Sequence, residues 1–515
     1  MNFARNVVAV AGYTMISRAT GFLRDMLIAS IGGAGPAADA FFVAFQIPNF
    51  FRRLTGEGAL TVAFVPMFAE MIESRNNQLA IAFAAQVQSI LLLFLLILLA
   101  LAEFTTPNLI ILLAPGFVGD DNRCGMAIEL TKIIFPYLLL ISLVALWGGM
   151  LNSIGKFSVM AAAPILLNLI MIASLIFPPG ILETPNHSLA WSVTIAGFVQ
   201  AFFLALACHR ESILPPLLLP RLTPEVKRLL VLIIPAALGA GIVQLNAFIG
   251  IWLASLLPTG SISYIYYADR VMQLPLGVVG VAIGTAILPM LARQVRTENT
   301  RGALLTQNKA IEVGLLLTVP VAMFLYLLAD PLIALLFQRG AFSVVDSDKT
   351  ASILAIYVAG LPAFVLIKIL QPGFFARQDT STPVRIGIAI TFVNVFCNIM
   401  FIRIFNQISI ALASVISSWI NVIMLATLLY RRRHILIDKC LFVRTLQILL
   451  SSVTTASIVS FLINKIDHLL IGTKLEQAIA IISLFLSGTV IYIILCLMMH
   501  IIYIRNYSLI WRNCR

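Results

Sequence analysis

The stretch Asp39–Ala69, DAFFVAFQIPNFFRRLTGEGALTVAFVPMFA, combines an apolar composition with charges that a lipid bilayer does not tolerate. Its first half is apolar enough to enter a membrane as a helix, and Pro48 with the glycines beyond it predicts a kink or a break. Arg52, Arg53 and Glu57 lie at that break. An arginine near mid-bilayer costs about 3 kcal/mol, and such side chains almost always face a watery cavity or a partner inside the helix bundle. The stretch therefore predicts a membrane helix that lines a polar cavity.

The composition of the whole chain indicates a polytopic membrane protein of the all-α class. Of its 515 residues, 60% are hydrophobic and only 11% are charged, against roughly 25% charged residues in a soluble domain. Long charge-free runs such as Ile90–Ala102 and Ala478–Met499 favour spanning helices over a β-barrel. The net charge of +12 is typical of basic cytoplasmic loops and does not require a nucleic acid partner.

Windows of roughly 20 apolar residues, divided at glycine, proline and charge, predict about fourteen transmembrane helices. The expected spans are 7–30, 38–72 (broken), 78–104, 130–150, 159–177, 188–208, 227–257, 265–291, 305–329, 350–371, 384–405, 408–430, 442–464 and 475–503. Lysine and arginine are about three times as frequent in the loops on the side of the N-terminus as in those on the other side. This bias places both termini in the cytoplasm, which agrees with an even number of helices.

A weak internal repeat predicts how these helices are grouped. Four pairs of matching positions recur at offsets of 223 to 226 residues: AFVPMFA (Ala63–Ala69) with AILPMLA (Ala286–Ala292), LLAPGF (Leu112–Phe117) with FQRGAF (Phe337–Phe342), Pro136 with Pro362, and Asn168 with Asn394. Chance similarity between apolar segments is the alternative, but the matched prolines and asparagines keep their order. We therefore expect two lobes of about six helices each, related as a parallel repeat around a central crevice. The expected parts are an N-lobe, 1–215, a C-lobe, 222–440, and two further helices with the C-terminus, 441–515.

Charges inside apolar segments identify the candidate site. They lie in the stretch above and in two others, SRATGFLRD (Ser17–Asp25) and YADRVMQLPLGVVGVAIGTAILP (Tyr267–Pro289). The set is cationic in excess, with Arg18, Arg24, Arg52, Arg53 and Arg270 against Asp25, Asp39, Glu57 and Asp269. The planar guanidinium group binds phosphate oxygens in a bidentate manner and does not titrate away. The hypothesis is that the cavity receives an anion such as a diphosphate.

Structural interpretations compete for some of these residues. Arg18 and Asp25 lie on one helix face, where they can neutralise each other as a structural pair, whereas Arg24 points elsewhere. Asp39 either caps the helix that it opens or acts at an outer gate. Lys368, within span 350–371, either snorkels to the interface or makes a second anion contact.

Span 265–291 is expected to supply the contribution of the second lobe. Arg270 is the candidate, because Asp269 is adjacent in sequence and cannot share its helix face. Gly277, Gly280 and Gly284 follow, and such small residues predict close helix contact or sliding.

The cysteines and histidines predict no metal site and no cofactor. The six cysteines show no CxxC spacing, and the five histidines show no paired spacing. Packing is the favoured role of the cysteines.

Several long motifs resemble a known family. The three charged stretches, LNSIGKF (Leu151–Phe157) and PGFFARQDTSTPV (Pro372–Val384) closely resemble the MurJ (MviN) lipid II flippases of the MOP superfamily, over essentially the whole chain. The resemblance implies two six-helix lobes and two extra helices. It also implies that lipid II, an undecaprenyl-diphosphate-linked disaccharide-pentapeptide, is moved from the inner to the outer leaflet of the bacterial cytoplasmic membrane for peptidoglycan synthesis.

The resemblance also carries expectations for single residues. It implies that Arg18, Arg24, Arg52 and Arg270 are essential and that Asp39 is important. The two extra helices are expected to form a groove for the isoprenoid tail. Some relatives carry Glu where this chain has Gln273, so Arg270 has one fewer candidate counter-charge nearby.

Sodium coupling is not expected in this chain. Some members of the family are thought to bind sodium through carboxylates on the helices that correspond to spans 227–257 and 384–405. Here these spans offer only amides: Gln244, Asn246, Asn394 and Asn398. Membrane potential acting on a cationic cavity is the expected energy source, at about 2.3 kcal/mol per charge per 100 mV.

Three other classes of protein compete with this interpretation. A flippase for another polyprenyl-diphosphate-linked oligosaccharide cannot be distinguished from a lipid II flippase by charge, because both substrates carry a diphosphate. Only the sequence motifs separate the two. A drug or cation exporter is expected to have an acidic cavity. A membrane enzyme needs acidic metal ligands or a nucleophile with its base, and Asp120–Asp121 and Asp346–Asp348 lack such spacing. We therefore expect a monomeric transporter, not an enzyme, with lipid II and membrane lipid as its partners.

Overall fold

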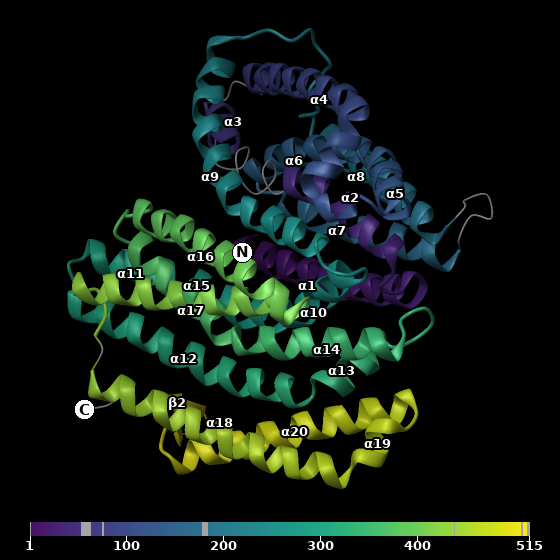
Figure 1. The fold of residues 1–515 in the computed structure, drawn as a ribbon. Helices are drawn as coiled ribbons and strands as arrows, with labels where there is room; N and C mark the ends of the chain where they lie inside the picture. Colours follow the sequence, from purple (N-terminus) through teal and green to yellow (C-terminus); the bar gives the residue numbers. More distant parts are fainter. Residues whose placement is uncertain are drawn as a thin grey trace. The chain divides into compact units, whose positions relative to one another are not determined.

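The computed structural model describes residues 2–52, 63–74, 77–177, 184–436, 438–505 and 508–511, with the side chains of 2–8, 235–247, 281 and 502–511 left aside (Figure 1). The described chain is helical apart from a short hairpin near its end, which confirms the all-α class. It forms two compact units, Met1–Ser263 with Arg339–Phe342, and Tyr264–Gln338 with Ser343–Arg515.

Unit 1 is a bundle of helices punctuated by proline. Its elements are α1 (Asn2–Gly32), α2 (Pro36–Arg52), α3 (Val65–Glu73), α4 (Asn77–Leu113), η2 (Pro115–Phe117), α5 (Asp121–Ile134), α6 (Pro136–Ser153), α7 (Phe157–Ile176), α8 (Pro185–Arg210) and α9 (Pro224–Ser255). Five of these elements, the short η2 among them, begin with proline, whose fixed φ suits the first helical position, where no N–H is needed. Within the unit α7 packs against α1 and α8, and α2 packs against α5.

Unit 2 contains the remaining helices. They are α10 (Ser261–Pro275, whose first residues belong to unit 1), the π-helical η3 (Leu276–Gly280), α11 (Val281–Arg296), α12 (Thr300–Leu327), α13 (Ala329–Phe337), α14 (Val344–Ala359), α15 (Leu361–Phe375), α16 (Ser381–Phe405), α17 (Ile408–Arg431), α18 (Lys439–Lys465), α19 (Asp467–Ile471) and α20 (Lys474–Met498). Figure 1 shows α18 running beside α12 and α20. Tyr492 of α20 donates a hydrogen bond to the Leu316 carbonyl of α12. The two C-terminal helices are thus anchored to the rest of unit 2.

The structure supports a polytopic membrane protein, with a lower count of clear spans than predicted. Among the described residues, ten helices are long and apolar enough to cross a membrane, or eleven if the bent pair Val344–Ala359 and Leu361–Phe375 is one span. Each predicted span coincides with a helix or a broken helix pair, so the expected total of about fourteen is plausible but not fixed. The predicted break after Arg52 lies largely outside the described residues.

Several of the approximate span boundaries differ from the helix ends in the structure. The last helix ends at Met498 and not at 503, because His500 adopts a left-handed φ of 55°. β1 (Ile502–Arg505) then pairs antiparallel with β2 (Ser508–Trp511), in a β-branched and aromatic segment that favours strands. The span predicted at 78–104 continues as α4 to Leu113, through Pro107.

Positions related by the repeat have similar structural roles. Pro136 opens α6 and Pro362 lies in the first turn of α15, each just after a break. Within unit 1, the Gly116 N–H donates to Ser255 Oγ at the end of α9, at 3.1 Å. At an offset of 225 for both partners, the Ala341 N–H donates to the Ser30 carbonyl near the end of α1, at 2.7 Å.

We call these two contacts the repeat-matched latches. Each joins a segment of one repeat copy to the first helix of the other copy. Both depend on glycine, because a Cβ at Gly116 would overlap the Ser255 carbonyl and a Cβ at Gly340 would overlap the Ser30 carbonyl. Gly340 also has a left-handed φ of 59°.

Candidate functional site

Arg24 lies inside unit 1, where its acceptors include the carboxylate of Asp25, the amide of Asn168 and, at 3.9 Å from Nη1, the sulfur of Met171. Its side chain is 6% exposed, and both Nε and Nη2 donate to Asp25 Oδ1, at 3.0 and 2.7 Å. Nη1 donates to Asn168 Oδ1 of α7 at 2.9 Å. A buried guanidinium needs such partners, because burying an unpaired charge is costly.

The structure differs from the alternative pairing of Arg18 with Asp25. Asp25 is buried against Arg24, while Arg18 is exposed on α1. Helix periodicity assigns adjacent residues to different faces, but an arginine side chain is long enough to bend back to its neighbour's carboxylate. Asp25 therefore neutralises the arginine next to it and not the one a helical turn or more away.

Arg52 is half-buried in the last turn of α2. Arg53 and Glu57, predicted at the same break, lie outside the described residues.

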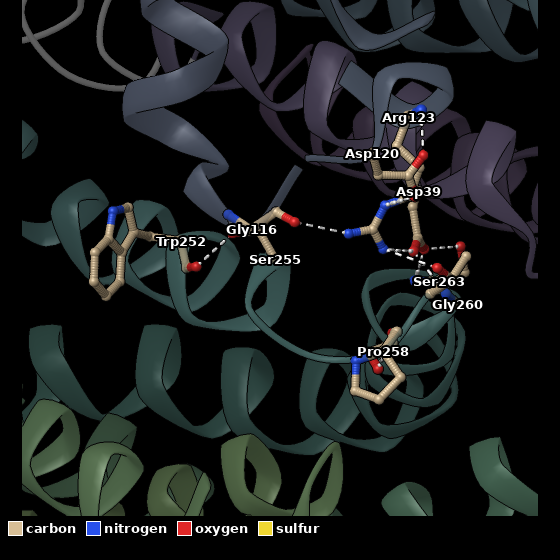
Figure 2. Close-up of polar contacts among 11 residues, drawn as sticks. Asp39, Gly116, Asp120, Arg123, Trp252, Ser255, Pro258, Gly260 and Ser263 are labelled. Atoms are coloured by element: carbon tan, nitrogen blue, oxygen red, sulfur yellow. Dashed lines mark hydrogen bonds and ion pairs between the residues drawn. The ribbon is translucent and has the colours of Figure 1, made fainter. Parts of the chain in front are cut away.

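Asp39 is 1% exposed and serves as a cap, but of a distant helix (Figure 2). Oδ2 accepts from the Gly260 N–H at 2.7 Å, and Oδ1 accepts from the N–H and the hydroxyl of Ser263 at 3.0 and 2.7 Å. These donors surround the start of α10, where unsatisfied N–H groups and the helix dipole favour an anion. Of the two roles expected for Asp39, these contacts show a cap, but of α10 and not of the helix in which Asp39 lies.

Arg123 is the residue that the sequence analysis missed (Figure 2). It is buried, donates to Thr259 Oγ1 and to the Gly116 carbonyl, both at 3.1 Å, and has Nη1 3.9 Å from Asp39 Oδ2. Asp120 is 3.1 Å from its Nε. In the sequence Arg123 lies between the predicted spans 78–104 and 130–150, so it is not among the charges found inside apolar segments.

We call this set the outer network: Asp39, Gly116, Asp120, Arg123, Ser255, Thr259, Gly260 and Ser263. It joins the starts of α2 and α5 to the turn between α9 and α10. It includes one of the two repeat-matched latches. The carboxylates of Asp39 and Asp120 offset the buried charge of Arg123.

In unit 2, Arg270 finds an aromatic partner that the sequence analysis did not propose. Its Nη2 donates to Tyr266 Oη at 2.7 Å, and its guanidinium carbon lies 4.7 Å from the centre of the Tyr266 ring. Tyr266 precedes Arg270 by one helical turn, so the two share a face of α10. Gln273, the position noted as a missing counter-charge, donates to Asp269.

Lys368 is exposed on α15, and the main chain around it packs closely on α11. A Cβ at Gly284 would lie 3.1 Å from the Lys368 carbonyl oxygen, and one at Gly280 would lie 3.3 Å from a methyl of Val365. The close helix contact predicted for these two small residues is confirmed.

Two further ion pairs occur in unit 2. Arg444 of α18 is paired with Glu312 of α12 at 2.8 Å, and both side chains are buried. The PGFFARQDTSTPV motif forms a turn in which Asp379 pairs with Arg432 and accepts from the Thr382 N–H. These contacts tie the loop between α15 and α16, and the helix α18, to the helices around them.

An apolar cavity of about 540 Å³ lies in unit 2. Side chains of α12, α14, α15, α17 and α18 line it, among them Tyr326 and Trp419. Among the described residues there is no group of three histidine, cysteine or acidic side chains that could hold a metal ion.

Long apolar helices with buried charges define the class: a multi-pass membrane protein. A solved multidrug transporter of the MATE family in the MOP superfamily, in an inward-facing conformation, matches with a TM-score of 0.68 at 17% identity, covering 83% of this chain and 98% of that one. At that identity the match shows the fold alone. A second structure, described as lipid II flippase MurJ in an inward closed conformation, matches with a TM-score of 0.77 at 25% identity, covering 96% and 99%.

The sequence comparisons identify the family. The family model described as lipid II flippase MurJ matches residues 28–501. A probable lipid II flippase MurJ from Rhizobium tropici is 41% identical over 474 residues, covering 91% of this chain and 89% of the relative. The chain belongs to the lipid II flippase MurJ family, which confirms the resemblance and the expectation that it is a transporter and not an enzyme.

Proposed function

We propose that this protein flips lipid II from the inner to the outer leaflet of the cytoplasmic membrane by alternating access, and so supplies peptidoglycan synthesis. The observation that carries the proposal is membership of the lipid II flippase MurJ family over residues 28–501. The buried, hydrogen-bonded Arg24 within a membrane bundle supports it, because such a charge is retained in lipid only for a function or a partner.

The substrate site that we propose is cationic. Arg18, Arg24, Arg52 and Arg270 bind the diphosphate, and Lys368 is a further candidate contact. Asp25, Asp269 and Glu57 are local counter-charges that hold arginines until the anion arrives. The contacts of Arg24 with Asp25 and of Arg270 with Tyr266 support this assignment, because each orients a guanidinium group.

Asp39 is proposed as part of the outer gate and not as a direct substrate ligand. Its carboxylate joins α2 to the start of α10, two helices from opposite copies of the repeat. Opening the outward end separates the copies, so these hydrogen bonds break and reform in each cycle. The repeat-matched latches are the contacts expected to act with it.

The lipid tail is proposed to run along the two C-terminal helices. The apolar cavity beside α18 supports this, because it offers carbon-lined space at the edge of unit 2. Of the two extra helices, α18 alone contributes to its lining. The Arg444–Glu312 ion pair would hold α18 in place beside it.

The remaining proposals concern the lobes, the membrane orientation, the oligomeric state and the energy source. We propose an N-lobe at 1–215, a C-lobe at 222–440 and a tail-binding part at 441–515, with both termini in the cytoplasm and a monomer as the working form. Membrane potential drives the cycle. Asn394 and Asn398 support the absence of sodium coupling, because they hydrogen-bond to Ser417 and to each other and carry no charge.

The test is depletion of the protein in a cell that has no other lipid II flippase, followed by leaflet-resolved measurement of lipid II. Loss of lipid II from the outer leaflet, with accumulation in the inner leaflet, is expected. Unchanged delivery refutes the proposal. Loss of a different polyprenyl-diphosphate-linked oligosaccharide, with lipid II unaffected, identifies the alternative substrate.

A further inference from the structure

Asn168 of α7 is buried, and its side-chain amide makes three hydrogen bonds to α1. Its Nδ2 donates to the Ser17 carbonyl at 3.0 Å and to Thr20 Oγ1 at 3.2 Å, while Oδ1 accepts from Arg24 Nη1 at 2.9 Å. The Thr20 hydroxyl donates to the Ile16 carbonyl, so its oxygen is left to accept. These partners set the amide orientation, because a flipped side chain would place NH₂ against the guanidinium and oxygen against a carbonyl.

The approach of Asn168 to α1 depends on a missing side chain. Gly21 lies between Ser17 and Arg24, and a Cβ there would be 3.3 Å from Asn168 Nδ2, tighter than most Cβ contacts. Gly21 and the three hydrogen-bond partners together form the surface that receives the amide. The side chain of Asn168 is thus held against α1 both by hydrogen bonds and by the close fit at Gly21.

An amide at this position has a different effect from a carboxylate. Asp25 accepts from the Nε and Nη2 side of Arg24 and carries the neutralising charge. Asn168 accepts from Nη1 and adds no charge, so it orients the guanidinium without lowering its attraction for an anion.

We propose that Asn168 is a positioning residue that orients Arg24 for diphosphate capture. The inference rests on the proposed function, in which Arg24 binds the lipid-linked diphosphate. Asn168 acts through Arg24 and does not itself contact the substrate. Because a guanidinium binds phosphate only when its plane is suitably directed, loss of the amide should weaken capture while the arginine remains.

The experiment is a double-mutant cycle on the full-length protein in nanodiscs, with lipid II as the probe in a binding titration. Asn168→Ala is expected to raise the lipid II dissociation constant about tenfold, the size of one lost charge-assisted hydrogen bond. Arg24→Ala is expected to raise it further. The double variant should bind no more weakly than Arg24→Ala, because Asn168 has nothing left to orient.

Gln88→Ala is the matched control. Gln88 is a buried amide that links α4 to α6 by accepting from Trp147 Nε1, and in the part of the chain that the structure describes its side chain makes no hydrogen bond to α1 or α7. Its loss should lower the melting temperature as much as Asn168→Ala does, with lipid II affinity unchanged. Equal losses of affinity in both variants would assign Asn168 a merely structural role and overturn the proposal.

The cycle separates two failures. Additive losses in the double variant overturn the positioning role and leave the proposed function intact. An Arg24→Ala variant that binds and flips lipid II normally removes Arg24 from the substrate site altogether. If Asn168→Ala does not fold, Gly21→Ala replaces it, because a methyl there displaces the amide by a few tenths of an ångström. Unchanged affinity in a folded Gly21→Ala protein then counts against the proposal.

Discussion

Replacing Asp39 by alanine is expected to release the start of α10. Three donors lose their acceptor: the Gly260 N–H, the Ser263 N–H and the Ser263 hydroxyl. A hydrogen bond to a charged acceptor contributes about 1.5–3 kcal/mol, and water can partly replace it once the turn opens. A net loss of about 2–4 kcal/mol between closed and open forms corresponds to a shift of roughly 30- to 1000-fold in their ratio.

Hydrogen exchange of the peptide that covers 256–266 measures this shift directly. Protection at residues 260 and 263 should fall by about 30-fold or more in Asp39→Ala and by about fivefold in Ser263→Ala, which loses one of three bonds. Ser261→Ala is the control, because the Ser261 hydroxyl donates within its own turn to Pro258 and not to Asp39.

The outcome has a clear refutation. A folded Asp39→Ala protein with normal protection at 260 and 263 would show that the carboxylate does not hold this turn. Equal deprotection in Ser261→Ala would attribute the effect to general loosening of the turn. Either result removes Asp39 from the proposed outer gate.

Three further expectations concern other parts of the molecule. Gly116→Ala should disturb the outer network and slow flipping in proteoliposomes, because its Cβ overlaps a main-chain carbonyl, whereas Gly125→Ala, whose Cβ meets nothing within 4 Å, should behave as wild type. Glu312→Gln should lower thermal stability by about 3 kcal/mol by leaving Arg444 buried without its counter-charge, and the apolar double variant Glu312→Leu with Arg444→Met should recover most of this. Burial, with nearby arginines, lowers the pKa of His434 from 6.5 to about 4. Its stabilising contribution is complete above pH 6.5 and is lost as the pH falls toward 4, so thermal melts should show less acid destabilisation in His434→Gln.

The helical framework was predictable because its signals are local. Apolar length, proline breaks and charge position follow from single windows of sequence, and the predicted spans coincide with helices or broken pairs. The end of the last helix was missed because termination depended on the φ of one residue, His500, and on strand pairing beyond it.

The partners of the charged residues were harder to predict. Asp39 has the local features of a cap for its own helix, yet its carboxylate accepts a hydrogen bond from the N–H of Gly260, 221 residues away in sequence. Arg24 finds a neighbour, Asp25, that helix periodicity assigns to another face. The local sequence around Arg123 did not predict its structural role, because only the fold brings its partners Thr259 and Gly116 within hydrogen-bond distance.

The sequence by itself determined that this is a helical membrane protein with an excess of arginine in its apolar segments, and it predicted an internal repeat. Those properties depend on the free energy of placing each residue in lipid and on spacing along the chain. Only the tertiary structure decided that Asn168 receives Arg24 and that Asp39 caps α10. The partner of a buried charge is the polar group that helix packing brings within hydrogen-bond distance, and this packing cannot be read from the local sequence.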